Sequence, residues 1–261
     1  MIAFIGGGNM AEALLRGLTR RGKRDIIVSE PRAERRQYLE RTYGVRTTAS
    51  NQEAAQEADI LVLAVKPQVL PEVLRELAPV VDDTKTVVSI AAGVRLQRLQ
   101  EALGTRRLVR VMPNAPALVG QGMSVMSLCE CFSDEAINRV KDIFMSVGTV
   151  LSLPEHHMDA VTALSGSGPA FFALYMEALL EASLELGLPE AEARELLQET
   201  LQGTLALLQE GLSPQRIRQM VTSPGGTTEA GLGVLKERGF EETVKEALLA
   251  AARRARELSG G

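Results

Sequence analysis

The chain is poor in residue types on which several classes of protein depend. Aromatic residues make up only 3% of its 261 residues, and Trp is absent. Proteins that bind single-stranded nucleic acid stack the bases on aromatic side chains. The net charge of -4 also opposes binding to a phosphate backbone. We therefore expect no nucleic-acid partner.

Cysteine and histidine are scarce as well. The two cysteines, Cys129 and Cys131, form a single C-x-C pair, and the two histidines are adjacent, at His156 and His157. A structural zinc site needs four ligands, and a Ser-His-Asp triad needs a suitably placed His. We expect no metal site and no His-based catalysis. Two cysteines cannot build a disulfide framework either, so we expect a reducing, cytoplasmic location.

Neither a signal peptide nor a membrane span is indicated. No basic segment precedes the apolar residues at the start of the chain. The longest uncharged stretch of interest, Ala160–Met176, has 17 residues and is interrupted by Ser165–Pro169. Because 17 residues is the lower limit for a membrane helix, we interpret this stretch as a buried helix or helix pair.

Residues 1–153 have the pattern of an α/β domain, in which apolar strands alternate with helical segments. Ile60–Val65 is an apolar run without polar alternation, as expected of a strand buried on both faces. Ser50–Glu53 fits a capping box, and Pro71 suits the first turn of a helix over Glu72–Leu77. We predict a parallel sheet with strands at Ile2–Ile5, Asp25–Ser29, Val45–Thr47, Asp59–Val65, Thr86–Ala91, Leu108–Val111, Met123–Ser127 and Thr149–Leu153.

Residues 154–261 differ in character and predict an all-helical domain. Apolar residues recur there at spacings of three and four, which is typical of amphipathic helices. The net charge changes from +3 over residues 1–152 (20 basic, 17 acidic) to -7 over residues 153–261 (9 basic, 16 acidic). We place a domain boundary near residue 154. The predicted long helices are Phe171–Leu186, Pro189–Gln209 and Phe240–Leu258.

Two stretches of this helical half are apolar on nearly every side. They are Ala160–Leu164 and Ala170–Leu174, and helices of this kind are buried all round. In so small a domain a partner subunit is the expected cover. The alternative is a self-contained helical bundle.

A glycine-rich turn follows the first predicted strand. Gly6-Gly7-Gly8-Asn9-Met10-Ala11 is a G-x-G-x-x-A motif that opens a predicted helix over Met10–Leu18. Gly6 permits a tight turn, Gly8 lets the backbone approach a pyrophosphate, and Ala11 lets the helix pack close to the sheet. The pyrophosphate then lies at a helix N-terminus, where free N–H groups favour anions. The motif predicts a dinucleotide cofactor; a glycine-rich turn without a cofactor is the alternative.

The end of the second predicted strand bears on the choice of cofactor. Glu30 lies about 20 residues beyond the glycines, where an acid binds the ribose hydroxyls of NAD. Arg32, Arg35 and Arg36 follow and could bind the 2′-phosphate of NADP instead, or could form a solvated helix face. The residues leave both cofactors open.

Three loops at the carboxyl edge of the predicted sheet favour a nicotinamide pocket there. Pro67 ends the fourth strand, because proline does not continue a central strand, and thereby places Lys66 at this edge. Ser89–Gly93 supplies small residues that leave room for a flat ring, and Met112–Pro116 is a rigid loop at the same edge. Ligands bind at this edge of open α/β sheets. Each loop taken singly has the composition of an ordinary connection.

Two segments of the helical half are rich in Gly, Ser and Thr. Ser165–Pro169 interrupts an apolar run, and Ser223–Glu229 precedes a helix. These residues form helices poorly but cradle anions through backbone N–H groups and hydroxyls. Ser223–Thr228 has more hydroxyls than packing requires, whereas Ser165–Pro169 could equally be a close helix crossing.

With these segments in view, the chain resembles the pyrroline-5-carboxylate reductase family over nearly its whole length. Phe4–Ala11, Ala64–Gln68, Ser89–Gly93 and Arg110–Asn114 match the family's motifs in the first half. Ala163–Ala170 and Ser223–Thr228 match in the second half and are more specific, because other Rossmann dehydrogenases lack them. Family members reduce L-1-pyrroline-5-carboxylate to L-proline with NADPH or NADH. Their helical domains intertwine in a homodimer, and dimers often assemble into decamers.

The resemblance also implies where the site residues lie. The active site is expected between the nucleotide domain of one subunit and the helical domain of its partner, with Thr228 near the ring nitrogen and Ser223 as a second catalytic group. The implied cofactor residues are Gly6, Gly7, Gly8, Asn9, Met10, Glu30, Asn51, Ala64, Val65, Lys66, Pro67 and Ala92. The implied substrate residues are Val221, Ser223, Gly225, Gly226, Thr227 and Thr228.

The chain departs from the family pattern at two positions. Glu30 stands where many relatives have a small or polar residue, which weakens the expectation of NADPH preference. Ala115 replaces a Thr that is common in the Met-Pro-Asn loop.

Two other functions are the alternatives to this reading. A 3-hydroxyacid dehydrogenase would carry a Lys in the long interdomain helix, and Ala160–Met176 contains none. A non-enzymatic NAD(P)-binding sensor would bind the cofactor without turnover. An assay of NAD(P)H oxidation with the alternative substrates separates all three.

Overall fold

The structure is a computed structural model that describes residues 1–128 and 132–260. Cys129 and Cys131, on which the exclusion of a C-x-C zinc site depends, lie outside the described residues. The chain forms two compact units: Met1–Pro169 together with Ala250–Gly261 is the first, and Ala170–Leu249 is the second. The predicted boundary near residue 154 concerns functional domains and stays a prediction.

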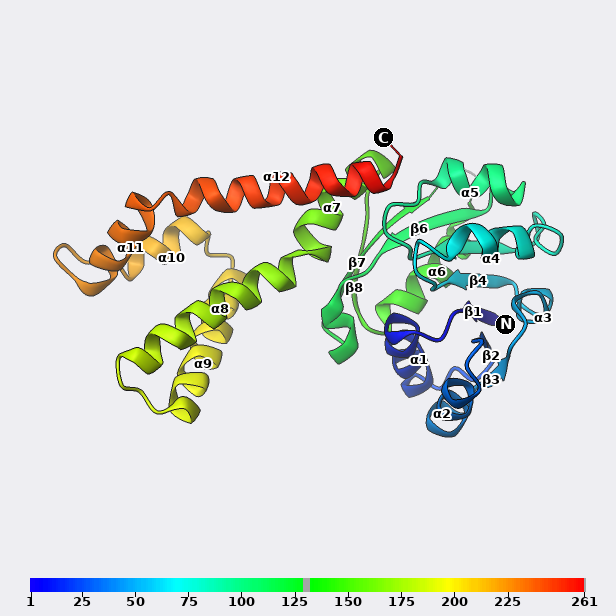
Figure 1. Cartoon of the computed structure of the whole chain (residues 1–261), viewed down its shortest axis with the longest axis horizontal. Coiled ribbons are helices and arrows are strands. Elements are labelled where there is room, and N and C mark those ends of the chain that lie inside the picture. Colours follow the sequence, from blue (N-terminus) through cyan, green and yellow to red (C-terminus); the bar gives the residue numbers. More distant parts are fainter. Residues whose placement is uncertain (129–131, 261) are drawn as a thin grey trace. The chain divides into compact units, whose positions relative to one another are not determined.

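One eight-stranded sheet forms the centre of the first unit (Figure 1). Its spatial order is β3-β2-β1-β4-β5-β6-β7-β8, with each predicted strand present to within a few residues. The strands are β1 (Ile2–Ile5), β2 (Ile26–Ser29), β3 (Arg46–Thr48), β4 (Ile60–Leu63), β5 (Thr86–Ser89), β6 (Leu108–Met112), β7 (Gly122–Leu128) and β8 (Gly148–Ser152).

The prediction of a parallel sheet is confirmed for β1 to β6 but is wrong for the last two strands. β7 runs antiparallel to β6, and β8 runs parallel to β7. The reason lies in the connection between β6 and β7, which contains only the short turn η1 (Ala115–Val119). Parallel neighbours need a crossover of a dozen or more residues, whereas antiparallel neighbours can be joined by short loops.

Helices cover both faces of this sheet, so that the first unit has three layers. The strands alternate their side chains between the faces: Phe4 joins one core cluster, while Ala3 and Ile5 join the other. The first cluster is completed by α1 (Asn9–Arg20), α2 (Ala33–Tyr43) and α6 (Asp134–Met145). The second is completed by α3 (Asn51–Glu57), α4 (Leu70–Leu77) and α5 (Leu96–Leu103).

The start of α3 shows the predicted capping box only in part. The Ser50 hydroxyl accepts the N–H of Glu53 at 3.2 Å, as expected. The Glu53 carboxylate, however, accepts from the Thr48 hydroxyl, and the N–H of Ser50 also donates to Thr48. Thr48 therefore replaces the reciprocal half of the box.

A series of short turns leads out of the sheet. It comprises η2 (Glu155–His157), α7 (Met158–Val161) and the π-helical turn η3 (Thr162–Gly166). Within it, Glu155 accepts from the buried Arg110 guanidinium at 3.2 Å and from the N–H of Leu96 at 2.8 Å. This carboxylate ties the turns to β6 and α5.

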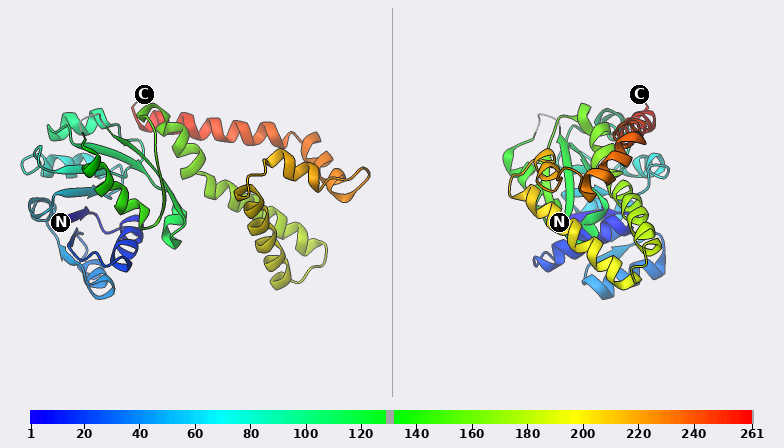
Figure 2. Two further views of the ribbon diagram at one scale, coloured as in Figure 1. Left: turned by 180° about the vertical axis from the view of Figure 1, so that it is seen from behind. Right: turned by 90° about the vertical axis from the view of Figure 1, so that its left-hand side faces the viewer.

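The second unit is helical throughout (Figure 2). The three predicted long helices are confirmed, and α12 has the predicted bounds. The helices that contribute to this unit are α8 (Gly168–Glu185), α9 (Glu190–Gln209), α10 (Pro214–Met220), α11 (Thr227–Glu237) and α12 (Phe240–Leu258), of which α8 begins and α12 ends in residues of the first unit.

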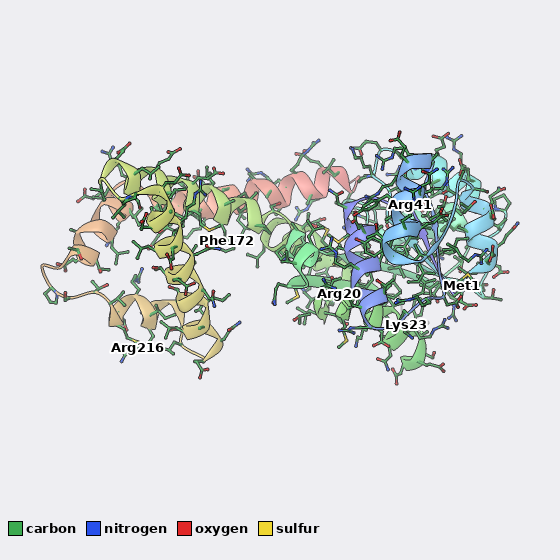
Figure 3. All side chains as sticks on the ribbon, turned by 90° about the horizontal axis from the view of Figure 1, so that it is seen from below. Met1, Arg20, Lys23, Arg41, Phe172 and Arg216 are labelled. Atoms are coloured by element: carbon green, nitrogen blue, oxygen red, sulfur yellow. The ribbon has the colours of Figure 1, made fainter. Side chains whose placement is uncertain are left out.

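Apolar side chains of α8 are left uncovered within a single chain. Phe172, labelled in Figure 3, is 68% exposed, and Leu174 is 67% exposed. The alternative of a self-contained bundle is therefore wrong for this helix. Among the described residues, no helix is long and apolar enough to cross a membrane.

Candidate active site

The glycine turn after β1 has a different requirement at each position. Gly6 has a φ of 103°, and a Cβ there would lie 2.9 Å from the carbonyl oxygen of Ala64. A Cβ on Gly7 would lie 2.8 Å from the Leu39 side chain. A Cβ on Gly8 would meet no atom of the described residues within 4 Å. The backbone therefore requires glycine at Gly6, whereas no contact among the described residues requires it at Gly8.

Gly8 is the N-cap of α1, and its carbonyl accepts the first helical hydrogen bond from Glu12. The N–H groups of a helix's first turn have no partner within the helix. Open space beside a glycine at such a helix end suits a diphosphate, which needs close backbone approach and positive dipole ends. These residues fit the dinucleotide predicted from the sequence.

Glu30, at the end of β2, is buried and contacts the glycine turn. Its carboxylate accepts the N–H of Gly7 at 3.2 Å and both the backbone N–H and the guanidinium of Arg32, at 3.1 and 2.8 Å. Burial by itself would raise the pKa of Glu30, but the hydrogen bonds from Arg32 and Gly7 outweigh it and lower the pKa. Glu30 is thus an ionised group beside the glycine turn.

The three arginines that follow have different surroundings. Arg32 pairs with Glu30, while its side chain is 69% exposed. Arg36 donates to the carbonyls of Glu30 and Pro31. Arg35 is mostly buried and donates to the carbonyl of Gly7 at 2.7 Å. Arg32 is therefore the most accessible of the three for a 2′-phosphate.

The loop after β4 lies beside the glycine turn. The N–H of Ala64 donates to the carbonyl of Ile5, and Val65 lies 3.0 Å from where a Gly6 Cβ would be. Lys66 and Pro67 continue this loop and are exposed. The structure thus brings Ala64 and Val65 together with Gly6, as the sequence predicts for the carboxyl edge.

Asn51, at the start of α3, is held by both ends of its amide. Its oxygen accepts from the Ser29 hydroxyl at 2.7 Å, and its nitrogen donates to Glu76 at 2.6 Å. Because Ser29 is the last residue of β2, this contact places Asn51 at the same sheet edge as Glu30.

The Met-Pro-Asn loop after β6 meets the Ser165–Pro169 segment. Asn114 donates to the Ser165 hydroxyl at 3.3 Å and accepts the N–H of Met123 at 2.9 Å. A Cβ on Gly166 would lie 2.7 Å from the Met112 methyl group. This methyl group is the end of a flexible side chain, so the role of the small residues in this segment stays a prediction.

The Ser223–Thr228 segment lies in the second unit, between α10 and α11. Gly225 has a φ of 69° and donates its N–H to Glu229 at 2.7 Å. A Cβ on Gly226 would lie 2.5 Å from the Ser223 hydroxyl oxygen. These contacts hold the loop in a tight turn before α11.

Gly226 is the N-cap of α11, and the cap has no side-chain hydrogen bond. The alternative that Thr228 is merely the helix N-cap is therefore wrong. Thr227 and Thr228 occupy the first two positions of α11. Thr228 is half-buried, and its hydroxyl makes no hydrogen bond to another described residue. It is available to a ligand together with the N–H groups of the helix end.

One cluster of polar side chains beside the glycine turn was not predicted from the sequence. Glu12 in α1 accepts hydrogen bonds from Arg35, Tyr38 and Tyr43 of α2. Glu12 is an acidic residue in the first turn of a helix that was predicted to bind a phosphate. An acid so close to a predicted anion site is the sequence feature that could have indicated this cluster.

A three-layered α/β unit with an open glycine turn at the start of α1 defines a dinucleotide-binding protein of the Rossmann class. Residues 1–93 match the family model "NADP oxidoreductase coenzyme F420-dependent". Residues 155–258 match the model "Pyrroline-5-carboxylate reductase dimerisation".

Relatives narrow the class to one family. The chain is 46% identical to the pyrroline-5-carboxylate reductase of Synechocystis sp., over 98% of this chain and 97% of that protein. It is 38% identical to the Coxiella burnetii enzyme of that name, whose structure covers 99% of this chain and 98% of its own with a TM-score of 0.90. The chain belongs to the pyrroline-5-carboxylate reductase family.

One solved relative was crystallised with a cofactor. The Plasmodium falciparum pyrroline carboxylate reductase structure has NADP bound, and it is 31% identical to this chain with a TM-score of 0.90 over 99% of this chain and 97% of that one.

Proposed function

We propose that this chain reduces L-1-pyrroline-5-carboxylate to L-proline with NADPH or NADH as the hydride donor. The observation that carries the proposal is the 46% identity over 98% of the chain to a pyrroline-5-carboxylate reductase. The open glycine turn and the Ser223–Thr228 loop supply in one chain the two kinds of site that the reaction needs.

On the cofactor side, the backbone of Gly6 to Met10 holds the diphosphate at the start of α1. Glu30 and Asn51 line the ribose end, while Ala64 to Pro67 and Ala92 line the part nearer the nicotinamide. When bound, the cofactor supplies a hydride to the imine carbon, so that the reaction needs no protein nucleophile.

On the substrate side, the chain's own groups bind and orient a cyclic imino acid. The Ser223–Gly226 turn holds the carboxylate against the free N–H groups at the start of α11, with Val221 and Thr227 beside it. The Thr228 hydroxyl accepts a hydrogen bond from the protonated ring nitrogen or donates one to the neutral form. Orientation of the ring provides most of the rate enhancement.

We propose functional domains at residues 1–153 and 154–261, the second of which forms a homodimer and, through further contacts, a decamer. The match of residues 155–258 to a dimerisation model supports the dimer, as do the exposed apolar residues of α8. The active site then combines the nucleotide domain of one subunit with the partner's helical domain. We place the enzyme in the cytoplasm, because two cysteines give no disulfide framework suited to an oxidising compartment.

The test of the function is an assay of NADPH and NADH oxidation with pyrroline-5-carboxylate, a 3-keto acid and no substrate. We expect turnover with pyrroline-5-carboxylate and accumulation of proline. Cofactor binding without turnover would instead identify a sensor, and turnover with the keto acid alone would identify a hydroxyacid dehydrogenase. Sedimentation of the same sample tests the assembly, since an active monomer at working concentration would contradict the shared site.

A further inference from the structure

We propose that Arg35 is a positioning residue that aims the N–H of Gly8 at the cofactor's diphosphate, and that it does not bind a 2′-phosphate. The inference rests on the proposed function for the class of cofactor. It assigns to Arg35 a role that its sequence position, three residues beyond Arg32, does not suggest.

The first observation is that side chains hold both polar atoms of Gly7. Its N–H donates to the buried carboxylate of Glu30 at 3.2 Å. Its carbonyl oxygen accepts from the Nε of Arg35 at 2.7 Å. The orientations of the peptide planes before and after Gly7 are therefore both set by residues outside the turn, which compensates for the conformational freedom of three successive glycines.

The second step follows from peptide geometry. The Gly7 carbonyl and the Gly8 N–H belong to the same peptide group, which is planar and trans. In a trans peptide the C=O and N–H bonds point in opposite directions. Since Arg35 in α2 holds the carbonyl on its side, the N–H of Gly8 must point away from α2.

The third observation concerns what the Gly8 N–H meets. Within the described residues it donates to no protein acceptor, and a Cβ on Gly8 would meet no atom within 4 Å. A donor fixed in open space at the start of a helix suits one oxygen of a diphosphate. Arg35 thus fixes the direction of a donor that has no acceptor among the described residues.

The last observation separates Arg35 from a phosphate-binding arginine. One of its two terminal guanidinium nitrogens, Nη2, pairs with Glu12 at 2.5 Å, and its side chain is only 19% exposed. Glu12 also accepts from the hydroxyls of Tyr38 and Tyr43, at 2.8 and 2.7 Å. The charge of Arg35 is therefore compensated by a carboxylate, and its fork is fixed between α1 and the glycine turn. Arg32, at 69% exposed, is the accessible cation nearby.

Three ligands distinguish aiming from phosphate binding. NADPH carries both a diphosphate and a 2′-phosphate, NADH carries the diphosphate alone, and adenosine 2′-monophosphate carries the 2′-phosphate alone. For Arg35→Ala we expect the Kd of NADPH and of NADH to rise by the same factor, about tenfold for one charge-assisted hydrogen bond. The Kd of adenosine 2′-monophosphate should not change. Titration calorimetry on the full-length protein measures all three.

The matched control is Arg41→Ala, which removes the same charge from an exposed position of the same helix (labelled in Figure 3). It should leave all three dissociation constants unchanged. If Arg35→Ala weakens NADPH and adenosine 2′-monophosphate but spares NADH, Arg35 binds the 2′-phosphate and the proposal is wrong. Unchanged binding of all three ligands would overturn it as well.

A second variant serves in case Arg35→Ala does not fold. Arg35→Lys keeps the charge but cannot contact Gly7 and Glu12 with a planar fork. We expect an equal and smaller rise in the Kd of NADPH and NADH; wild-type affinities would overturn the proposal. Turnover of pyrroline-5-carboxylate by the wild type is measured separately, so that a binding protein without turnover would refute the proposed function and leave the role of Arg35 standing.

Discussion

Gly93 lies directly against Leu258, near the end of the chain. A Cβ on Gly93 would be 2.9 Å from the Leu258 Cβ and 3.1 Å from its carbonyl carbon. Beside this contact, the Ser259 hydroxyl lies 3.3 Å from the Asp159 carboxylate. The last turn of α12 therefore closes on the loop after β5, next to the proposed cofactor residue Ala92.

This contact predicts an unusually large effect of Gly93→Ala. Gly93 has a φ of 73°, which is strained for any residue with a Cβ, and the new methyl group would also collide with α12. The matched control is Gly104→Ala, because Gly104 has a φ of 71° but meets nothing within 4 Å. We expect a loss of about 1 kcal/mol for the control, and about 1–3 kcal/mol more for Gly93→Ala.

Urea denaturation at one fixed protein concentration measures both losses, since the concentration affects the stability of an oligomer. Equal losses of unfolding free energy in the two variants would mean that α12 shifts without cost and does not constrain the loop after β5.

Substitutions of Gly6 and Gly8 are expected to have opposite effects on folding and on cofactor binding. Gly8→Val adds a side chain to space that is empty of protein, so the melting temperature should remain within a few degrees of wild type. The same side chain would occupy the approach of the diphosphate, and we expect NADPH affinity to fall by about a hundredfold or more, roughly 3 kcal/mol. Gly6→Val should instead prevent stable folding, because its Cβ would press on the Ala64 backbone. Unchanged NADPH affinity of Gly8→Val in a fluorescence titration would contradict the placement of the diphosphate.

The sequence predicts the strands well because its apolar runs reflect burial. Ile60–Leu63 is buried along its whole length, and the run of aliphatic residues identifies it without any tertiary information. The glycine turn is equally recognisable, since its spacing and its place after β1 are local features.

The direction of a strand, and contacts between residues far apart in the sequence, could not be predicted in the same way. The residues of β7 do not indicate its direction, and the short connection through η1 reverses it. The contact of Arg35 with Glu12 joins residues 23 positions apart, and that of Tyr43 with Glu12 joins residues 31 apart. Such contacts depend on how α2 packs beside α1, which no local pattern specifies.

Glu30 has two roles in the structure, and one substitution tests both. Glu30→Ser removes the acceptor of the Gly7 N–H, so the affinity for both NADPH and NADH should fall. It also removes a negative charge near the ribose and frees Arg32, so the ratio of kcat/KM for NADPH to that for NADH should rise. Measuring kcat/KM with each cofactor separates the two effects. An unchanged ratio would show that Glu30 does not face the ribose.

The carboxylates of Glu12 and Glu30 predict a loss of stability in acid. Burial would raise the pKa of each, but hydrogen bonds from Tyr43, Arg35 and Tyr38 at Glu12, and from Arg32 and Gly7 at Glu30, lower it below the ordinary 4.5. The unfolded chain therefore binds more protons than the folded protein just below this value. Stability from these groups is present above pH ~4.5 and is lost as the pH falls through their folded pKa.

Chemical denaturation across this pH range tests the assignment. Glu12→Gln should flatten the decline of the free energy of unfolding below pH ~4.5. Glu34→Gln, which removes an exposed carboxylate from α2, is the control and should leave the decline unchanged. A decline that is the same in wild type and Glu12→Gln would show that Glu12 does not contribute to it.

Removing the Thr228 hydroxyl is expected to lower turnover without lowering stability. The N-cap of α11 is Gly226 and not Thr228, and the Thr228 hydroxyl has no hydrogen bond within the described chain. Thr228→Ala should therefore leave the melting temperature unchanged. If the hydroxyl binds the ring nitrogen of the substrate, its loss leaves a polar group unpaired at about 1–3 kcal/mol, and kcat/KM for pyrroline-5-carboxylate should fall about ten- to a hundredfold.

Two further variants make the Thr228 test specific. Thr228→Ser keeps the hydroxyl and should retain most of the turnover, which ties the effect to hydrogen bonding. Among the described residues, the Thr243 hydroxyl donates only to the carbonyl of Gly239, just before its own helix. Thr243→Ala removes this hydroxyl, and its kcat/KM should match the wild type. The Kd of NADPH should be the same in all of these variants, because we propose that Thr228 belongs to the substrate loop. A Thr228→Ala protein that melts lower but turns over normally would assign the hydroxyl to folding, and one with weakened NADPH binding would place it at the cofactor instead.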